Sequence, residues 1–390
     1  MKKVILSFLA LSTIAITSCS DDDNVTVPVP VATHAKTVSD INLDGVSAPA
    51  TYTFDRSGAT SVSYGGQTTR IKMAKELSSA LKVNTNTEVQ LDNMYADGTG
   101  FDEAGLDTSG KKLRNKSGAS LDFFDGAVEG VTIKEYFDNL IKGQVDNVFT
   151  NWSTTAQAGT AGQIANGSST RYVNAKGIEY NQVFAKGLIG ALQVDQALNG
   201  YMSKVVNDDN TTVSDNYTTM EHHFDEAYGY LMNSEDDAFF SKYLTKVDSN
   251  PNFTGIESEI GQAFRIARQA IVDQKYAVRD QAIEVLRYQV SRAVAIRTIH
   301  YLQAGKAQIA PSTMGGAFHD LSEGMGFVYS LRFLRKSDIT DTYFTKAEVD
   351  GFLADMEADN GLWDITPATL DGICNDIADK FDFTMAQAAL

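Results

Sequence analysis

Cysteine is almost absent from this sequence, since its 390 residues include only Cys19 and Cys374. We expect Cys19 to be consumed by lipid modification, which leaves Cys374 as the only thiol. A single thiol excludes an intramolecular disulfide and a metal site built on cysteines. The stability of the protein must therefore come from a large apolar core, which a hydrophobic content of 43% makes feasible.

The apolar run near the N-terminus is too short to span a bilayer as a mature helix. It covers 4–16, follows the basic start MKK, and ends in ITSC, a sequence similar to a lipobox. These features predict a lipoprotein signal peptide over 1–18 and lipidation of Cys19. The sequence SDDDN after Cys19 resembles the acidic export signals of surface-displayed lipoproteins in Bacteroidetes-type bacteria. We therefore expect an outer-membrane lipoprotein, displayed on the cell surface through a lipid anchor.

Basic residues are also few: the chain has 33 Lys and Arg but 50 Asp and Glu, which gives a net charge of −17. This balance argues against nucleic acid as a partner and against a basic membrane-binding patch. An acidic surface can concentrate cations, but it more commonly serves solubility. The sequence also contains no P-loop, no GxSxG nucleophile elbow and no HExxH zinc motif.

Proline is scarce, with six residues in the chain, which is compatible with long helices. We expect a lipidated flexible tether over 19–50 and one helical domain over 51–390. The alternation of polar and aromatic residues over 52–64 predicts a small N-terminal β decoration. A polar connection is expected at 153–170. Apolar periodicity predicts helices at 69–81, 132–149, 173–206, 256–304 with a break near 272–273, 346–358 and 367–380.

Two short sequences resemble each other: HHFDEAYGY, which starts at His222, and HDLSEGMGF, which starts at His319. Each has a glutamate four residues after the histidine and a glycine three residues after the glutamate. Upstream, VNAKGIE and VRDQAIE also match faintly, in the same order. We interpret this as an internal duplication. The fold class expected is all-α, with two similar helical-bundle halves at about 121–250 and 251–390.

A histidine and a glutamate at positions i and i+4 share one face of a helix. Such a pair can bind a divalent metal, act as an acid/base pair, or form an ordinary hydrogen bond in a bundle core. Gly229 and Gly326 would keep that face open for a partner backbone or a ligand. Glu284 could add a carboxylate from a neighbouring helix. The candidate metal-binding cluster, in a cleft between the halves, comprises His222, Glu226, His319, Glu323 and Glu179.

Three segments of the chain together resemble a known family: YTFDRSGATSVSYGGQTTR, KGIEYNQVFAKGLIGALQVDQ and HHFDEAYGYL. They are similar to the DUF4856 lipoproteins of Bacteroidetes, which resemble imelysin-like (peptidase M75-type) proteins. This resemblance implies an all-helical fold of two similar bundles and a link to bacterial iron uptake. The Gly-x-His-x-x-Glu motif of the imelysin-like proteins falls near Gly177 and Glu179, but its histidine is not matched. This departure counts against a peptidase.

These observations lead to three hypotheses. In the first, a surface-anchored lipoprotein binds a divalent metal, iron or a metal complex in iron acquisition, with a TonB-type outer-membrane receptor as its partner. In the second, a structural or partner-docking outer-membrane lipoprotein has no ligand of its own. In the third, the protein is a metal-dependent peptidase. Convergence of the two His/Glu motifs would favour the first hypothesis, and the sequence does not decide it.

Overall fold

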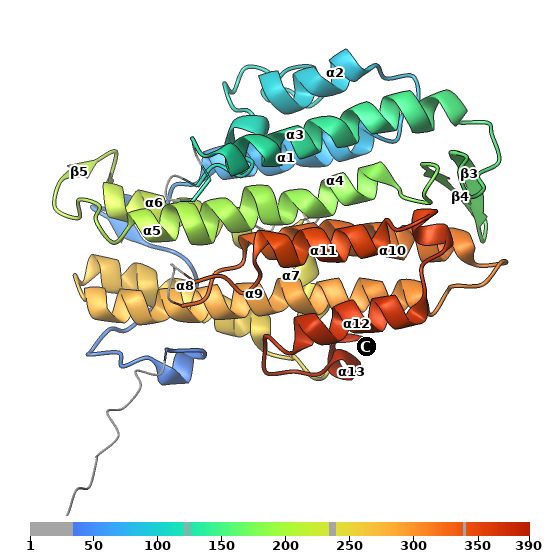
Figure 1. Ribbon diagram of the computed structural model, residues 1–390. Coiled ribbons are helices and arrows are strands. Elements are labelled where there is room, and N and C mark those ends of the chain that lie inside the picture. The colour runs from blue at the N-terminus through green and yellow to red at the C-terminus, as the bar shows by residue number, and fades with distance from the viewer. Residues whose placement is uncertain (1–33, 121–122, 125, 234–238, 338–340) are drawn as a thin grey trace, which may run out of the picture. The chain divides into compact units, whose positions relative to one another are not determined.

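The computed structural model describes residues 34–120, 123–124, 126–233, 239–337 and 341–390. The described residues form one compact, mostly helical unit over His34–Leu390 (Figure 1). The signal peptide, Cys19 and the tether before residue 34 lie outside the described residues. The α-helices are α1 Gly65–Ala80, α2 Glu88–Asp92, α3 Val128–Gly143, α4 Tyr180–Leu188, α5 Met202–Lys204, α6 Thr219–Leu231, α7 Phe240–Asp248, α8 Ile256–Val272, α9 Tyr276–Lys306, α10 Met314–Ser330, α11 Lys346–Met356, α12 Pro367–Ala378 and α13 Met385–Ala388.

The strands of the described residues form three separate two-stranded antiparallel sheets. They are β1 Asp55–Arg56, β2 Ala59–Thr60, β3 Gly162–Asn166, β4 Ser169–Val173, β5 Val213–Ser214 and β6 Tyr217–Thr218. None of these sheets is large enough to form a layer of its own. The core is therefore built from helices.

α10 lies between α4 and α9 and contacts both along its length (Figure 1). α4 continues through the π-helical segment η6 Ile189–Tyr201 into α5, and every residue of η6 is buried. Two glycines permit close packing against α10. A Cβ on Gly190 would lie 2.5 Å from the Ser330 Cα, and one on Gly326 would lie 2.5 Å from the Lys186 Cβ. α10 is therefore a central helix of the described unit, packed between α4 and α9.

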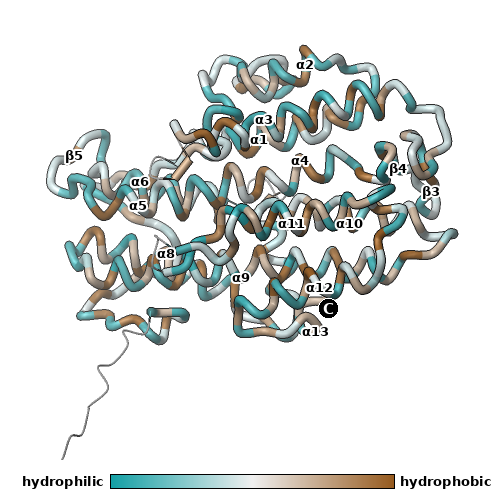
Figure 2. The backbone as a smooth tube through the Cα atoms, viewed as in Figure 1, coloured by the Kyte–Doolittle hydropathy of each residue, from teal (hydrophilic) through white to brown (hydrophobic). Residues whose placement is uncertain are grey.

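Helix ends follow the local sequence. Thr218 caps α6 and Thr345 caps α11, each in a reciprocal capping box with a glutamate three residues later. The expected break near 272–273 is confirmed, because α8 ends at Val272 and Gln274 has a φ of 56°. Apolar and polar residues interleave along the helices, as Figure 2 shows. Among the described residues, no helix combines the length and the apolar character needed to cross a bilayer.

The helix expected over 173–206 begins later, at Tyr180. Residues 153–170, expected as a polar connection, include β3 and the start of β4, which pair in register from Gly162 with Val173 to Asn166 with Ser169. Gly177, with a φ of 80°, then turns the chain into α4. Within 153–170, Ile164 is the only apolar residue besides alanine, so the strand pattern there is weak.

Residues 34–50, expected as the end of the flexible tether, pack on the helical unit instead. Ala35, Ile41 and Val46 are buried in the core. The carboxylate of Glu284 on α9 accepts a hydrogen bond from the Ala35 amide and lies 2.9 Å from the His34 ring. The apolar residues of this segment are spaced too irregularly to show a helical or strand period, so the sequence pattern did not reveal the docking.

Candidate functional site

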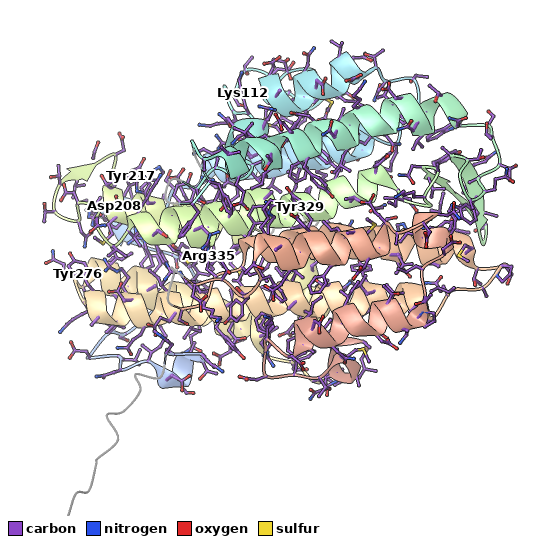
Figure 3. All side chains as sticks on the ribbon, in the orientation of Figure 1. Lys112, Asp208, Tyr217, Tyr276, Tyr329 and Arg335 are labelled. Atoms are coloured by element: carbon purple, nitrogen blue, oxygen red, sulfur yellow. The ribbon has the colours of Figure 1, made fainter. Side chains whose placement is uncertain are left out.

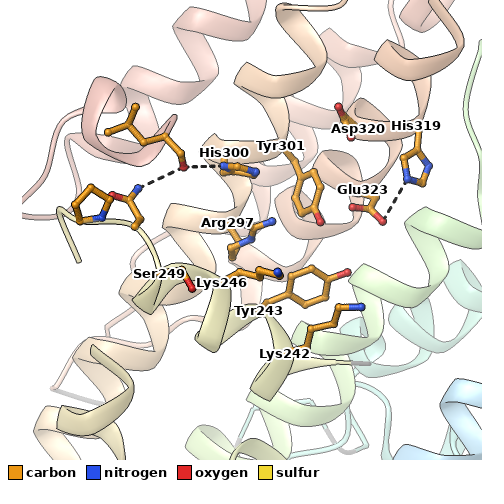
Figure 4. Close-up of a pocket in the computed structure, with 13 residues that line it drawn as sticks. Lys242, Tyr243, Lys246, Ser249, Arg297, His300, Tyr301, His319, Asp320 and Glu323 are labelled. Atoms are coloured by element: carbon orange, nitrogen blue, oxygen red, sulfur yellow. Dashed lines mark hydrogen bonds and ion pairs between the residues drawn. The ribbon is translucent and has the colours of Figure 1, made fainter. Parts of the chain in front are cut away.

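A cavity of about 550 Å³ lies where α7, α9 and α10 meet (Figure 4). We call it the α10 cavity. Its volume falls in the range of about 300–1,000 Å³ that is typical of small-molecule sites. It is lined by Lys242, Tyr243, Lys246, Ser249, Asn250, Pro251, Arg297, His300, Tyr301, His319, Asp320, Glu323 and Leu390.

The second His/Glu motif forms a chain of contacts at the edge of this cavity. His319 Nδ1 lies 3.2 Å from Glu179 Oε1, and His319 Nε2 lies 3.8 Å from Glu323 Oε1. Glu323 Oε1 is also 2.9 Å from Lys186 Nζ. Glu179 is fixed in turn, because its amide donates to Ser322 Oγ and Arg171 Nε lies 3.8 Å from its carboxylate. A carboxylate on Nδ1 orients the ring and leaves Nε2 as the atom available to a ligand.

The charges around Glu323 favour its ionised form. Burial opposes ionisation, but Lys186 and His319 outweigh burial and lower the pKa of Glu323. The neighbouring Asp320 differs, since burial raises the pKa of its carboxyl group. Burial and the nearby Glu323 carboxylate together raise the pKa of Tyr301 far above its ordinary value. The Tyr301 hydroxyl is therefore a hydrogen-bond donor at neutral pH.

Arg297 on α9 provides a buried positive charge in the wall of the α10 cavity. It is 7% exposed, and its guanidinium carbon lies 4.6 Å from the centre of the Tyr301 ring and 5.5 Å from that of Tyr243. Its Nε has no hydrogen-bond partner, and it forms no ion pair with any carboxylate in the described residues. Lys242 and Lys246 add two further cations without such a pair.

A second cavity, of about 490 Å³, lies beside α6, and we call it the α6 cavity. Tyr217, which Figure 3 labels, lines this cavity. Asp208, also labelled there, is hydrogen-bonded to the lining residue His223. The cavity is lined by Ser63, Gly65, Gly66, Gln67, Arg70, Lys111, Lys116, Tyr201, Lys204, Tyr217, His222, His223 and Glu226.

The first His/Glu motif lies in this α6 cavity. Glu226 Oε1 accepts a hydrogen bond of 2.7 Å from Gln67 Nε2 on α1. The His222 ring stacks on Tyr217, with ring centres 4.6 Å apart, and its Nδ1 has no hydrogen-bond partner in the part of the chain that the structure describes. His223 differs from His222, since its Nδ1 lies 2.7 Å from Asp208 Oδ2. Within the described residues, no hydrogen bond or ion pair joins His222 to Glu226, so this motif is not a bonded pair.

The five residues expected in one metal-binding cluster thus fall into two separate groups. His319, Glu323 and Glu179 come together beside α10, whereas His222 and Glu226 line the α6 cavity. In the described parts of the chain, no group of three or more His, Cys, Asp or Glu side chains is placed to hold a metal ion. Glu284, considered as a further carboxylate, is bonded to His34 and Ala35 instead.

The two motif glycines have the same structural role in both places. A Cβ on Gly229 would lie 2.4 Å from the Tyr64 Cβ, at the start of α1, and one on Gly326 would lie 2.8 Å from the Val183 carbonyl oxygen of α4. In each case the residue three positions further along the partner helix, Gln67 or Lys186, contacts the motif glutamate. The expectation that these glycines admit a partner backbone is therefore confirmed at α4.

Several lining residues were not predicted as site residues. Arg297, His300 and Tyr301 are spaced i, i+3 and i+4 on α9 and so share one face, a signal that the sequence AIRTIHYLQ contains. His300 Nδ1 lies 3.0 Å from the Leu390 carbonyl oxygen. Lys186 and Arg70 are different, because only the packing of α4 and α1 places them next to the motifs.

The described residues form a mostly helical unit with several cavities of small-molecule size, and the two His/Glu motifs lie at two of them. The chain belongs to the family described as domain of unknown function DUF4856, whose profile matches residues 49–384. This match confirms the resemblance to that family and extends it over nearly the whole described unit. No curated protein and no solved structure matched the chain.

Proposed function

We propose that this protein binds an anionic metal complex in the α10 cavity and takes part in metal acquisition, with iron as the metal. The observation that carries the proposal is Arg297, a buried cation that lies against two tyrosine rings and has no carboxylate partner among the described residues. A buried charge is costly unless it is paired. An anionic ligand in the cavity would supply the missing negative charge.

The charges favour a complex over a bare metal ion. Protein sites for a bare transition metal usually provide three or four ligands. Here Glu323 is already neutralised by Lys186, and Glu179 is engaged by His319. His319 Nε2 is the atom best placed to occupy one coordination position of a metal whose other positions are filled by a chelator. Arg297 would then bind the carboxylate or phenolate groups of that chelator.

The setting of the protein is part of this proposal. A lipidated Cys19 would hold the helical unit at the outer-membrane surface, where a TonB-type receptor is the natural partner for uptake. The shared packing of the two motif glycines and glutamates supports the proposed duplication into two imelysin-like halves. The choice of iron as the metal rests on the resemblance to imelysin-like proteins.

Ferric citrate is a suitable probe because it is an anionic iron complex of small size. We expect the purified protein to bind ferric citrate in isothermal titration calorimetry, and to bind iron-free citrate at least tenfold more weakly. His319→Ala should weaken binding of ferric citrate but not of citrate, because only the metal contacts the imidazole. Absence of binding to ferric citrate would overturn the proposal, and so would binding of bare ferric or zinc ions without binding of the citrate complex.

Arg297→Gln removes the buried positive charge on which the proposal rests, and we expect it to weaken ferric citrate binding at least tenfold. Since Arg297 is buried, thermal unfolding monitored by circular dichroism must show that the variant folds. The double variant Lys242→Gln with Lys246→Gln gives a second test, because Lys242 is half-buried and Lys246 is exposed. Arg292→Gln is the matched control, because Arg292 lies on the same helix but contacts the Phe253 ring outside the cavity.

A further inference from the structure

We propose that the α6 cavity is a second, independent site that binds a phosphate group, either as free phosphate or as part of a phosphorylated small molecule. This site shares no lining residue with the α10 cavity. It therefore goes beyond the proposed function and can be tested separately from it.

The first argument is the balance of charge in the cavity wall. Four side chains with a permanent positive charge line the cavity, and Glu226 is the only lining carboxylate. The four cations are Arg70, Lys111, Lys116 and Lys204. Such a concentration of positive charge is unexpected in a chain with a net charge of −17. A low-dielectric cavity with walls of one sign attracts ligands of the opposite sign.

Arg70 provides the second argument, because it is buried without a carboxylate to balance it. Its side chain is 7% exposed, and its Nε donates to the Lys112 carbonyl oxygen. A weaker contact of 3.4 Å joins its Nη1 to the Gly66 carbonyl oxygen. These carbonyls orient the guanidinium but leave its charge unpaired within the described residues. Planar guanidinium groups bind phosphate through two parallel hydrogen bonds.

The first turn of α1 adds donors at the same place. The amide groups of Gly65 and Gly66 have no hydrogen-bond acceptor in the described residues, and both glycines line the cavity. A Cβ on Gly66 would lie 3.6 Å from both Lys111 Nζ and Arg70 Nη1. The helix N-terminus, the guanidinium and the ammonium group therefore face one small region. Helix N-termini bind phosphate through free amides and the helix dipole.

Polar atoms without partners further along the wall would suit the rest of a phosphorylated molecule. Gln67 is 1% exposed, and no described residue donates a hydrogen bond to its Oε1. That oxygen accepts hydrogen bonds, so it fits a ligand hydroxyl rather than the phosphate itself. His222 Nδ1 likewise has no partner. A buried polar atom without a partner is costly, and a ligand with hydroxyl groups would satisfy it.

Calorimetry with inorganic phosphate, glucose 6-phosphate and glucose tests this proposal. We expect one or both phosphate compounds to bind and glucose not to bind. Binding of inorganic phosphate alone identifies free phosphate as the ligand, and stronger binding of glucose 6-phosphate identifies a phosphorylated small molecule. If neither phosphate compound binds, the proposal of a phosphate site is wrong.

The double variant Lys111→Gln with Lys204→Gln should weaken phosphate binding at least tenfold, because two charge-assisted contacts are lost. Neither lysine forms an ion pair with a described carboxylate, so the fold should tolerate the change. Lys112→Gln is the matched control, since Lys112 is adjacent in sequence, faces Asp97 at 3.5 Å and does not line the cavity. Equal binding by the double variant and the wild-type protein would contradict the proposal, whatever the α10 cavity binds.

Discussion

Lys186 Nζ on α4 lies 2.9 Å from Glu323 Oε1 on α10, and the two side chains are each only 10% exposed. Removing one partner of a buried ion pair leaves the other charge unbalanced, at a cost of about 3–5 kcal/mol. We therefore expect Lys186→Met to lower the free energy of unfolding by about that amount, measured by urea denaturation at pH 7. Lys242→Met is the control, because Lys242 lines the same cavity without such a pair.

A second substitution separates the charge from the packing of the Lys186 side chain. Adding Glu323→Gln to Lys186→Met removes the stranded carboxylate, so the double variant should be more stable than Lys186→Met alone. If the double variant is no more stable, the loss comes from packing around the lysine stem rather than from the unpaired charge of Glu323.

Arg268 has a comparable role beside α6. It is fully buried, and it holds Asp225 at 2.9 Å through Nε and Glu221 at 2.9 Å through Nη1. We expect Arg268→Met to reduce the free energy of unfolding by about 3–5 kcal/mol, since Asp225 then has no cation partner. Arg265→Met, on the same helix, should change it by less than about 1 kcal/mol.

The cost of Arg268→Met should depend on pH in a defined direction. Burial already raises the pKa of Asp225 to about 6, although Arg268 opposes this effect. Without Arg268 the pKa rises further, so the folded variant holds a proton that the unfolded chain releases. Because the pKa of Asp225 is higher in the folded variant than in the unfolded chain, the stability of the variant falls as the pH increases above the unfolded-state pKa. Urea denaturation at pH 5 and pH 8 should show the larger loss at pH 8, and an equal loss would contradict this account.

Gly326 and Gly351 should respond oppositely to alanine. In α10, a Cβ on Gly326 would lie 2.8 Å from the Val183 carbonyl oxygen, so backbone must move. We expect Gly326→Ala to destabilise by about 1–3 kcal/mol. A Cβ on Gly351, inside α11, would meet no atom within 4 Å, so Gly351→Ala should stabilise by about 0.5–1 kcal/mol. Thermal unfolding of both variants checks the contrast, and a loss at Gly351 would refute it.

The sequence predicts the helical parts of this fold well because their signals are local. The recurring apolar residues over 256–304 indicate α8 and α9, although neither helix begins with a capping side chain. The sequence also predicts the close approach of a partner backbone at Gly326, because a small residue on a helix face leaves room for it. The signal of the β3–β4 hairpin is weaker, because its loop Gly167-Ser168 is a turn signal but its strands show no regular apolar alternation. The hairpin is also held by contacts that are not visible in the sequence, such as the stack of Trp152 on Tyr172, with ring centres 3.4 Å apart.

The arrangement of the site depends on contacts that are distant in sequence. Spacing alone places His319 and Glu323 on one face, but Glu179 and Lys186 reach them only because α4 packs on α10. The two motifs face different cavities because α6 packs against α1 and η6, whereas α10 packs against α4 and α9. A similarity between two motifs predicts similar local packing. It does not predict that their side chains meet.

Cys374 should be unreactive in the folded protein. It is fully buried, and burial raises the pKa of its thiol to about 12. Only the thiolate reacts readily with disulfide reagents. In a Cys19→Ser protein, whose only thiol is Cys374, Ellman's reagent at pH 8 should react on the timescale of unfolding and rapidly in urea. Fast reaction of the native protein would show that α12 opens far more often than its burial indicates.

Glu348 in the first turn of α11 should make stability depend on pH. Lys380 lies 2.9 Å from its carboxylate, and that contact together with the Thr345 amide lowers the pKa of Glu348 to about 2. Because the pKa of Glu348 is lower in the folded state, its charge stabilises the fold at pH values above the unfolded-state pKa of about 4.5. This contribution is lost as the pH falls toward 2. Because Glu348 is 37% exposed, solvent screening limits the effect to about 0.5–1 kcal/mol. Glu348→Gln should therefore be less stable than wild type at pH 7, and urea denaturation should show the difference shrinking below pH 4. A difference that stays constant down to pH 3 would mean that the cap geometry, and not the charge, accounts for the stabilisation.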